Sequence, residues 1–534
     1  MNQVGLKRRQ IEIYISMIGL ISLLLLGSIL NLNGLAYFAA AYECVGVAWY
    51  LIGSKTSDTL ARMLKARHNK GQYRNIAIVS KYIFICQGLL SLVVGLVLAA
   101  CAEWIAVSLF HMQYSSSMIV AFAAAFFLRT ISSVLLGMFQ GEGSEMPALI
   151  TGILRQTLFL LLGLIGAIRF SDYGEKVSNL LGRDEFRSMY AALGVACALG
   201  LTELLLLSGL LFMKKRTGKS AKQKMQEGMK TTDSFGSIVT VFYANMGMDA
   251  LICVLEWLPL FIGTCIYLGR PEENRVLAVH FGVFAGKYIA ICGVMLLPVC
   301  AALLVMAART IGSMRRDEQR IAKALFQSGI HIGVIHGLFL SVFAAVMAEP
   351  LAAWFCRTQQ PLLVSMLRMG SAIVFLLSLA FYFMKVLLFA GRKLMVLGSL
   401  AVVNVVFVLS VFLLTGTEAQ TIIAFVYSGV VGSLVGCILL GVFAFRLLHS
   451  GMELVQTFGI PAAGTLVCGL VGVLLEKLLM PHLGGMVTVL VALAITGIGY
   501  WTILLLTGNV KEQELRMTPF GHVIYYLGHL FHLV

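Results

Sequence analysis

The stretch LLGMFQGEGSEMPALITGILRQT, residues 135–157, contains the pattern that decides the fold of this chain. An apolar run ends in the glycine-rich acidic segment GEGSEMP, and a second apolar run follows at once. Gly141 and Gly143 permit a tight turn, and Pro147 suits the first turn of a helix. The stretch therefore predicts two apolar helices joined by a short elbow, with Arg155 inside the second helix.

The composition identifies the surroundings of these helices. The chain has 534 residues, of which 59% are hydrophobic and 12% are charged, whereas soluble domains carry about 25% charged residues. Apolar runs long enough to cross about 30 Å of hydrocarbon recur along the chain. The first run, residues 11–30, lacks a small-residue cleavage site, so we expect a span there and not a signal peptide. We therefore predict an all-α polytopic membrane protein.

The apolar runs predict about fourteen transmembrane helices in two six-helix lobes plus two C-terminal helices. The expected spans are residues 11–31, 35–53, 78–102, 117–139, 147–168, 189–213, 236–268, 275–307, 329–348, 363–390, 394–415, 420–446, 458–480 and 484–507. The expected domains are an N-terminal lobe (1–213), a basic linker (214–235), a C-terminal lobe (236–447), two additional helices (448–507) and an amphipathic tail (508–534). The lobes have similar layouts, because a basic segment follows the second and the eighth span, and internal repeats of this kind are typical of transporters.

The basic residues predict the orientation. Clusters of Lys and Arg occur in residues 7–9, 55–74, 214–230 and 309–323, which all lie on the side of the N-terminus. The connections on the other side carry fewer, namely Arg169, Lys176, Arg183, Arg187, Arg270, Arg275 and Arg357. Because positively charged loops stay in the cytoplasm, we expect both termini there. The tail TPFGHVIYYLGHLFHLV (518–534) has apolar residues at helical spacing and is expected to lie on the inner membrane surface. Anionic lipids of that leaflet explain the net charge of +15 without nucleic acid.

Three segments carry a family resemblance, one of them residues 33–75 with the second span and its basic linker. The segment RTISSVLLGMFQGEGSEMPALITGILRQ (129–156) resembles the fourth-to-fifth span region of the multidrug/oligosaccharidyl-lipid/polysaccharide (MOP) flippase superfamily, where an arginine precedes a GxFQG elbow and Met-Pro starts the next helix. The segment NVKEQELRMTPFGHVIYYLG (509–528) is similar to the tail of the polysaccharide and stage V sporulation protein B-like branch. The resemblance implies a monomeric transporter. The first span lacks the cation that lipid II flippases of this superfamily typically carry, so the resemblance does not single out lipid II. We interpret four elbow residues as structural: Gly137, Gln140, Gly141 and Pro147.

Cationic side chains inside the apolar runs are the candidate substrate residues. An ionisable side chain at mid-bilayer costs at least about 2.5 kcal/mol and normally faces a cavity or a partner. Arg129 and Arg155 lie on neighbouring predicted helices, and the planar guanidinium fork suits a pyrophosphate. The alternative is a structural ion pair with Glu203 or Glu43. Two further cations are candidates for the same cavity: Lys287, flanked by small residues in FGVFAGKYIAICG, and Arg368.

Acidic and amide side chains form a second candidate set. Asn245, Asp249 and Glu256 have spacings of four and seven residues and therefore share one face of the predicted seventh span. An acidic face in lipid suits a coupling ion or a proton, and the alternative is a counter-ion for Lys287. Glu43, in the second span, is a candidate for the same ion-coupling or counter-ion role.

Several classes of chemistry lack their motifs. The 11 cysteines are scattered without CxxC, and the ten histidines show no HExxH spacing, so we expect no metal site. We find no P-loop of the GxxxxGK[ST] kind and expect no cofactor. The longest outer connection, residues 169–188, has no histidine and no convincing acid and base pair. We therefore expect a transporter and not an enzyme.

Two functions are compatible with these observations. The first is a flippase in the bacterial cytoplasmic membrane that moves polyprenyl-pyrophosphate-linked saccharides by alternating access, for cell-surface polysaccharide or peptidoglycan synthesis. Its partners would be the lipid-linked saccharide and membrane lipids. The alternative is an antiporter of organic cations or drugs of the multidrug (MATE) type, coupled to H⁺ or Na⁺. Such a site should be net acidic, whereas the embedded charges here are slightly more often basic.

Overall fold

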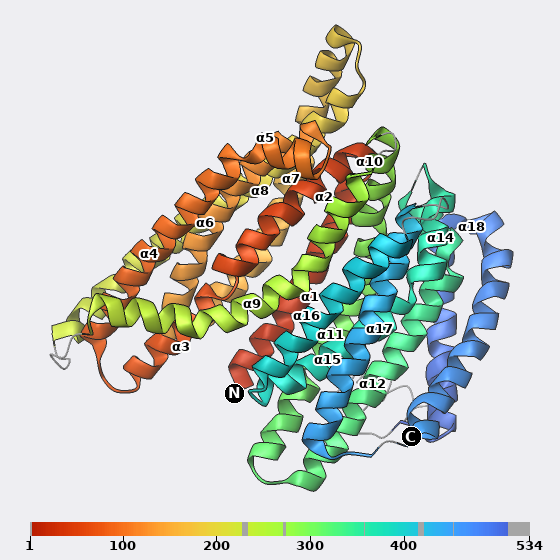
Figure 1. Cartoon of the computed structure of the whole chain (residues 1–534). Coiled ribbons are helices and arrows are strands. Elements are labelled where there is room, and N and C mark those ends of the chain that lie inside the picture. The colour runs from red at the N-terminus through yellow and green to blue at the C-terminus, as the bar shows by residue number, and fades with distance from the viewer. Residues whose placement is uncertain are drawn as a thin grey trace. The chain divides into compact units, whose positions relative to one another are not determined.

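The computed structural model describes residues 3–226, 233–270, 274–356, 358–414, 421–451 and 453–510. Within these ranges the regular structure is entirely helical (Figure 1). The chain divides into two compact units. The N-terminal unit is Leu25–Gly282, and the C-terminal unit combines Met1–Leu24 with Val283–Val534.

The N-terminal unit contains the second to tenth α-helices. In chain order its elements are α2 (Asn31–Ala48), the π-helical turn η1 (Trp49–Gly53), α3 (Thr56–His68), α4 (Tyr73–Ala100), α5 (Ala102–Trp104), η2 (Ile105–Leu109), η3 (Gln113–Ser115), α6 (Ser116–Gly141), α7 (Met146–Leu181), α8 (Glu185–Gln226), α9 (Phe235–Leu268) and α10 (Asn274–Val283).

The C-terminal unit contains most of the first helix and all helices after α10. Its elements are α1 (Gln3–Leu26), the π-helical turn η4 (Phe284–Tyr288), α11 (Ile289–Arg315), α12 (Gln319–Val346), α13 (Ala348–Phe355), α14 (Gln360–Gly370), α15 (Ala372–Phe389), α16 (Lys393–Leu414), α17 (Thr421–Leu448), η5 (Val455–Gly459) and α18 (Ile460–Leu506).

The predicted membrane-spanning character is confirmed. Thirteen helices in the described ranges are long and apolar enough to cross a membrane. The last of them, Val455–Leu506, folds back on itself at Gly484, whose φ of 70° is left-handed and suits glycine. A methyl group on Gly464 would lie 3.3 Å from the ring of Tyr500, so the two halves are antiparallel neighbours. Counting α18 as two segments gives fourteen.

The backbone groups of a helix pair within that helix, as hydrocarbon requires. Hydroxyl groups within the apolar runs donate back to carbonyls four residues earlier. The Thr130 hydroxyl donates to the Phe126 carbonyl at 2.9 Å, and the Thr310 hydroxyl donates to the Met306 carbonyl at the same distance. Threonine and serine can therefore lie in these spans without unpaired donors.

Three features differ from the sequence predictions or lie outside the description. The predicted tenth span, 363–390, is divided into two helices, because the helix is interrupted at Ser371, between Gly370 and Ala372. The predicted lobe boundaries at 213 and 236 stay a prediction; the compact units instead place α9 with α2–α8, and residues 3–24 of α1 with α11–α18. The amphipathic tail helix falls on residues 511–534, outside the described residues.

Small residues set the distance between α7 and α8, two of the helices that position the site described below. A Cβ atom on Gly166 would lie 2.6 Å from the Gly194 carbonyl oxygen. The backbones therefore approach more closely than any residue with a side chain would allow. Without a hydrophobic driving force in lipid, such close packing is what holds transmembrane helices together.

Candidate functional site

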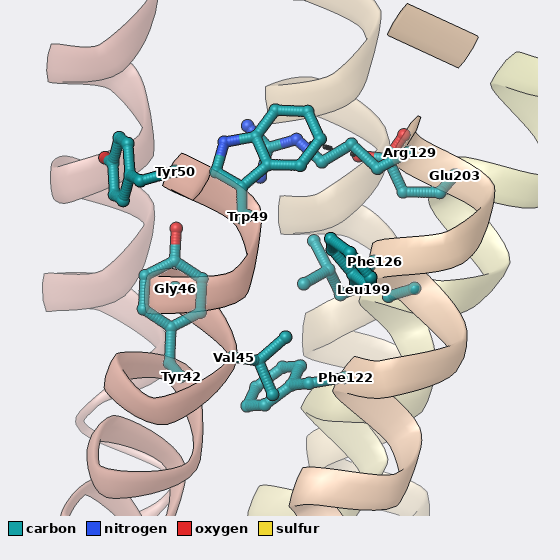
Figure 2. Close-up of a pocket in the computed structure, with 11 residues that line it drawn as sticks. Tyr42, Val45, Gly46, Trp49, Tyr50, Phe122, Phe126, Arg129, Leu199 and Glu203 are labelled. Atoms are coloured by element: carbon teal, nitrogen blue, oxygen red, sulfur yellow. Dashed lines mark ion pairs between the residues drawn. The ribbon is translucent and has the colours of Figure 1, made fainter. Parts of the chain in front are cut away.

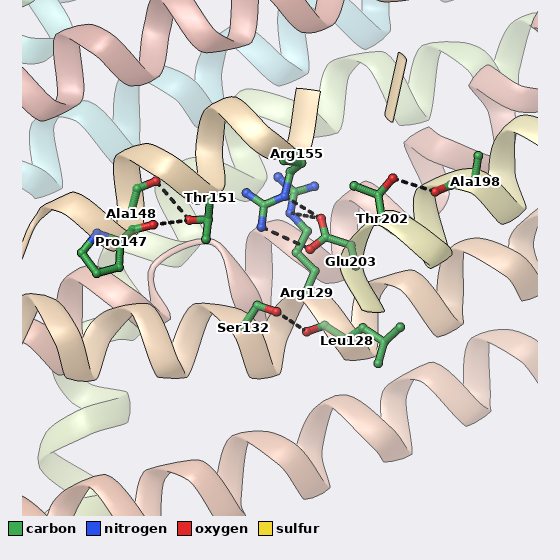
Figure 3. Close-up of polar contacts among 10 residues, drawn as sticks. All are labelled: Leu128, Arg129, Ser132, Pro147, Ala148, Thr151, Arg155, Ala198, Thr202 and Glu203. Carbon is green, nitrogen blue, oxygen red and sulfur yellow. Dashed lines mark hydrogen bonds and ion pairs between the residues drawn. The ribbon is translucent and has the colours of Figure 1, made fainter. Parts of the chain in front are cut away.

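A buried carboxylate lies at the centre of the candidate site. Glu203, on α8, has a fully buried side chain. Arg155, on α7, donates to it through both prongs of its guanidinium: Nε to Oε1 at 2.6 Å and one terminal nitrogen to Oε2 at 3.1 Å. Figure 3 shows Arg155 and Arg129 converging on this carboxylate from two helices. Bidentate pairs of this kind are the strongest form of ion pair, so Arg155 and Glu203 tie α7 to α8.

Arg129 approaches the same carboxylate but is held differently. Its Nε lies 3.9 Å from Glu203 Oε1, which is within ion-pair range but too long for a hydrogen bond. Its guanidinium carbon lies 4.2 Å from the centre of the Trp49 ring. Among the described residues, the buried Nε of Arg129 has no hydrogen-bond partner. Arg129 is therefore a cation with unused donors, stacked on an indole.

A break in helical geometry accompanies Trp49. This residue begins the π-helical turn η1, and its ring lies against the position where a Cβ of Gly53 would be. A larger residue at 53 would displace the indole from Arg129. Single π-helical turns within membrane helices occur frequently at functional sites. The C-terminal unit has a corresponding turn, η4, which contains Lys287.

Trp49, Arg129 and Glu203 line a narrow cavity of about 30 Å³, roughly the space of one water molecule. Figure 2 shows Arg129 and Trp49 at one end of it and aromatic side chains along its walls. The aromatic side chains in the lining are Tyr42, Trp49, Tyr50, Phe122 and Phe126. In this conformation the cavity therefore has room only for a ligand of a few atoms.

The charges of the site sum to a net positive value. Two arginines share one carboxylate, and the stronger contact neutralises Arg155. The remaining charge resides on Arg129, which is 29% exposed. A guanidinium with free donors in a partly desolvated cavity favours an anion with several acceptor oxygens, such as a phosphate or pyrophosphate.

The other two predicted substrate cations lie in the C-terminal unit, each with a partner of its own. Lys287 is buried, and its ammonium donates to the Leu24 carbonyl of α1 at 3.2 Å. The amide of Ser28, which would serve this carbonyl in a continuing helix, bonds to Leu25 instead. Lys287 therefore caps the C-terminal end of α1, where a cation is favourable. Arg368 forms an ion pair with Glu349 at 2.6 Å, and both side chains are half exposed.

The predicted acidic set divides into one buried and three more accessible residues. Glu43 is buried and accepts a hydrogen bond from the Thr264 hydroxyl at 2.6 Å. Asp249 forms an ion pair with Arg62 at 3.1 Å. Asn245 and Glu256 are exposed. Glu43 and Asp249 thus contact other residues than the arginines of the site, and their ion-coupling roles stay a prediction.

The elbow residues are arranged around helix contacts and a turn. Gly137 and Gly141 lie within α6, where a Cβ on Gly137 would be 2.9 Å from the Ser57 carbonyl oxygen of α3. The turn itself uses Gly143, whose φ is 93°. Gln140 is buried in α6, and Pro147 lies in the first turn of α7. Gly141 therefore allows close packing of α3, and the tight turn predicted for it is made by Gly143.

Sequence reasoning missed Trp49 and the other aromatic residues of the cavity wall. An aromatic residue in an apolar run gives no signal by itself, because lipid-facing and cavity-facing positions are equally apolar. The available signal was a tryptophan followed four residues later by a glycine, in WYLIG (49–53). Among the described residues no group of three or more His, Cys, Asp or Glu side chains could hold a metal ion.

Solved structures of transporters share this fold. The lipid II flippase MurJ in an inward closed conformation superposes with a TM-score of 0.64 at 10% identity, covering 92% of this chain and 97% of that one. An inward-facing multidrug resistance MATE family transporter of the MOP superfamily gives 0.55 at 16% identity, covering 84% and 95%. A MOP superfamily transporter from Pyrococcus furiosus gives 0.52 at 15% identity, covering 83% and 94%. No protein-family model and no curated protein matches the sequence. The chain therefore has the fold of MOP superfamily transporters.

Proposed function

We propose that this chain is a flippase for lipid-linked saccharides, in which Arg129 binds the pyrophosphate that joins the saccharide to its polyprenyl carrier. The observation that carries the proposal is the unequal sharing of Glu203: Arg155 takes the carboxylate with two hydrogen bonds, and Arg129 keeps unused donors. A pyrophosphate offers the planar guanidinium several acceptor oxygens at once. The similarity to a lipid II flippase over most of both chains supports the same reading.

Binding and release at this site would proceed by alternating access. The cavity is too small for a headgroup in this conformation, so the helices around it must separate to admit the substrate. The stacked indole holds the guanidinium in place while the site is empty, and the anion would displace the long contact to Glu203. The saccharide would belong to a cell-surface polysaccharide or peptidoglycan precursor, and the protein would act as a monomer in the bacterial cytoplasmic membrane with both termini in the cytoplasm.

A second candidate function has an observation of its own. The cavity wall is rich in aromatic rings, which also attract organic cations. Asp249 and the exposed Glu256 could then couple cation export to H⁺ or Na⁺ entry. The similarity to MATE family transporters fits this alternative. Arg129 argues against it, because a cation within the cavity repels a cationic substrate.

A reconstitution assay separates the two functions. Liposomes containing a polyprenyl-pyrophosphate oligosaccharide are mixed with a membrane-impermeant sugar-modifying enzyme, which reports the fraction of substrate in the outer leaflet. We expect the protein to raise this fraction from about half towards completion, relative to protein-free liposomes. Exchange of an organic cation for H⁺ or Na⁺, without any change in saccharide accessibility, would replace the flippase by the antiporter.

A further inference from the structure

A groove in the C-terminal unit lies outside the site described above. It has a volume of about 790 Å³ and is formed by the start of α1, the end of α11 and the start of α12. Its apolar wall comes from five side chains: Leu6, Val305, Ala308, Ile321 and Leu325. Its polar lining includes three cations and one acid: Lys7, Arg309, Arg316 and Glu318. The volume is within the range of about 300–1,000 Å³ that is usual for small-molecule sites.

The cations of this groove are not balanced by its acid. Arg316 is paired with Glu318 at 3.2 Å and donates to the Ser313 hydroxyl at 3.3 Å. Among the described residues, Lys7 and Arg309 have no ion-pair or hydrogen-bond partner. Their neighbours in sequence do have partners, since Arg8 pairs with Glu12 and Arg315 donates to the Phe389 carbonyl. Within the part of the chain that the structure describes, the groove therefore has two unpaired positive charges, Lys7 and Arg309.

The combination of charge and apolar wall indicates the chemistry of the ligand. A soluble phosphate would use the two cations but would leave the apolar wall in contact with water. A lipid with an anionic headgroup uses both, because its acyl chains cover the wall while its phosphates meet the cations. Basic pockets between transmembrane helices recognise anionic lipid headgroups in this way. Two unpaired cations match a lipid with two phosphates better than a lipid with one.

We propose that the groove between α1, α11 and α12 binds an anionic phospholipid of the inner leaflet, with Lys7 and Arg309 as its headgroup ligands. The proposal does not depend on the transported substrate, because the groove lies within one unit and shares no residue with the Arg129 site. A lipid there would join the first helix of the chain to α11 and α12.

The experiment measures lipid binding to the purified full chain by native mass spectrometry, with cardiolipin, phosphatidylglycerol and phosphatidylcholine as probes. The test variant is Lys7→Gln with Arg309→Gln. The matched control is Arg320→Gln with Lys323→Gln, which removes two charges from α12 at residues that do not line the groove. We expect the test variant to bind cardiolipin about 30-fold more weakly than the wild type, and the control to stay within about twofold.

Three results would overturn the proposal. Equal losses in the test and control variants would show that only net charge matters. Equal binding of phosphatidylcholine and cardiolipin to the wild type would show that no headgroup is recognised. Displacement of cardiolipin by inorganic pyrophosphate at similar concentration would show that the ligand is a free phosphate. Thermal unfolding of both variants without added lipid checks that each is folded. If the double variant is not folded, the single variant Arg309→Gln replaces it, and we expect it to bind cardiolipin about fivefold more weakly than the wild type.

Discussion

Replacement of Arg129 by glutamine is expected to lower the initial rate of saccharide flipping by about 10- to 100-fold. The variant keeps a polar but shorter side chain and loses the charge and the planar fork that would meet the pyrophosphate. A hydrogen bond to a charged group contributes about 1.5–3 kcal/mol, which corresponds to this range of rates. The measurement is the accessibility assay in liposomes, at equal amounts of reconstituted protein.

Arg216 provides the matched control for this experiment. It also stacks on an aromatic ring, because its guanidinium carbon lies 4.7 Å from the centre of the Phe212 ring. Arg216 is exposed, however, at the end of the span Glu185–Arg216 of α8. The Arg216→Gln variant should flip the lipid-linked saccharide at the wild-type rate. Arg129→Lys should give an intermediate rate, because lysine keeps the charge but not the fork. Wild-type flipping by Arg129→Gln would remove Arg129 from the mechanism.

Replacement of Glu203 by glutamine is expected to destabilise the protein by about 3–5 kcal/mol. The exchange leaves two guanidinium groups next to each other without a counter-ion in a largely buried site. The double variant Arg155→Met with Glu203→Gln should be less destabilised than the sum of the single variants, because it removes a charge of each sign. The measurement is thermal unfolding of the purified variants in one detergent.

An exposed ion pair of the same unit serves as the control. Glu175 lies 3.7 Å from Arg187, and both side chains are about half exposed. Glu175→Gln should change stability by about 0–1 kcal/mol, as is usual for solvated pairs. If Glu203→Gln were as mild as Glu175→Gln, the buried arrangement would not hold the helices together.

The fold could be predicted from the sequence where a pattern of residues is compatible with only one structure in a membrane. Long apolar runs indicated the spans, and the elbow at 141–147 indicated the reversal between α6 and α7. The interruption between Gly370 and Ala372 was missed, although the pair Gly370 and Ser371 is a kind of sequence at which helices kink. The compact unit that contains α9 together with α2–α8 could not be derived from the sequence, since helix neighbours depend on shape matching and not on hydrophobic periodicity.

The site was partly predictable for a related reason. Arg129 and Arg155 were identified because a charge in an apolar run is conspicuous. The choice between Glu43 and Glu203 as their partner required knowledge of which helices are adjacent. The structure places Glu203 on α8, beside α7, whereas Glu43 on α2 contacts Thr264. Trp49 was missed, although its ring determines how Arg129 is held.

The central claim is that a pyrophosphate-linked lipid binds at Arg129, and Trp49 provides a direct probe because it stacks on that residue. The measurement is the change in tryptophan emission when the purified protein is titrated with a polyprenyl-pyrophosphate oligosaccharide. Trp49→Phe separates the signal of this residue from that of the other four tryptophans, since the chain has five. We predict a saturable change that is absent in Trp49→Phe and at least tenfold weaker in apparent affinity in Arg129→Gln. A change of equal affinity in Arg129→Gln, or a response to organic cations and not to the pyrophosphate lipid, would contradict the account.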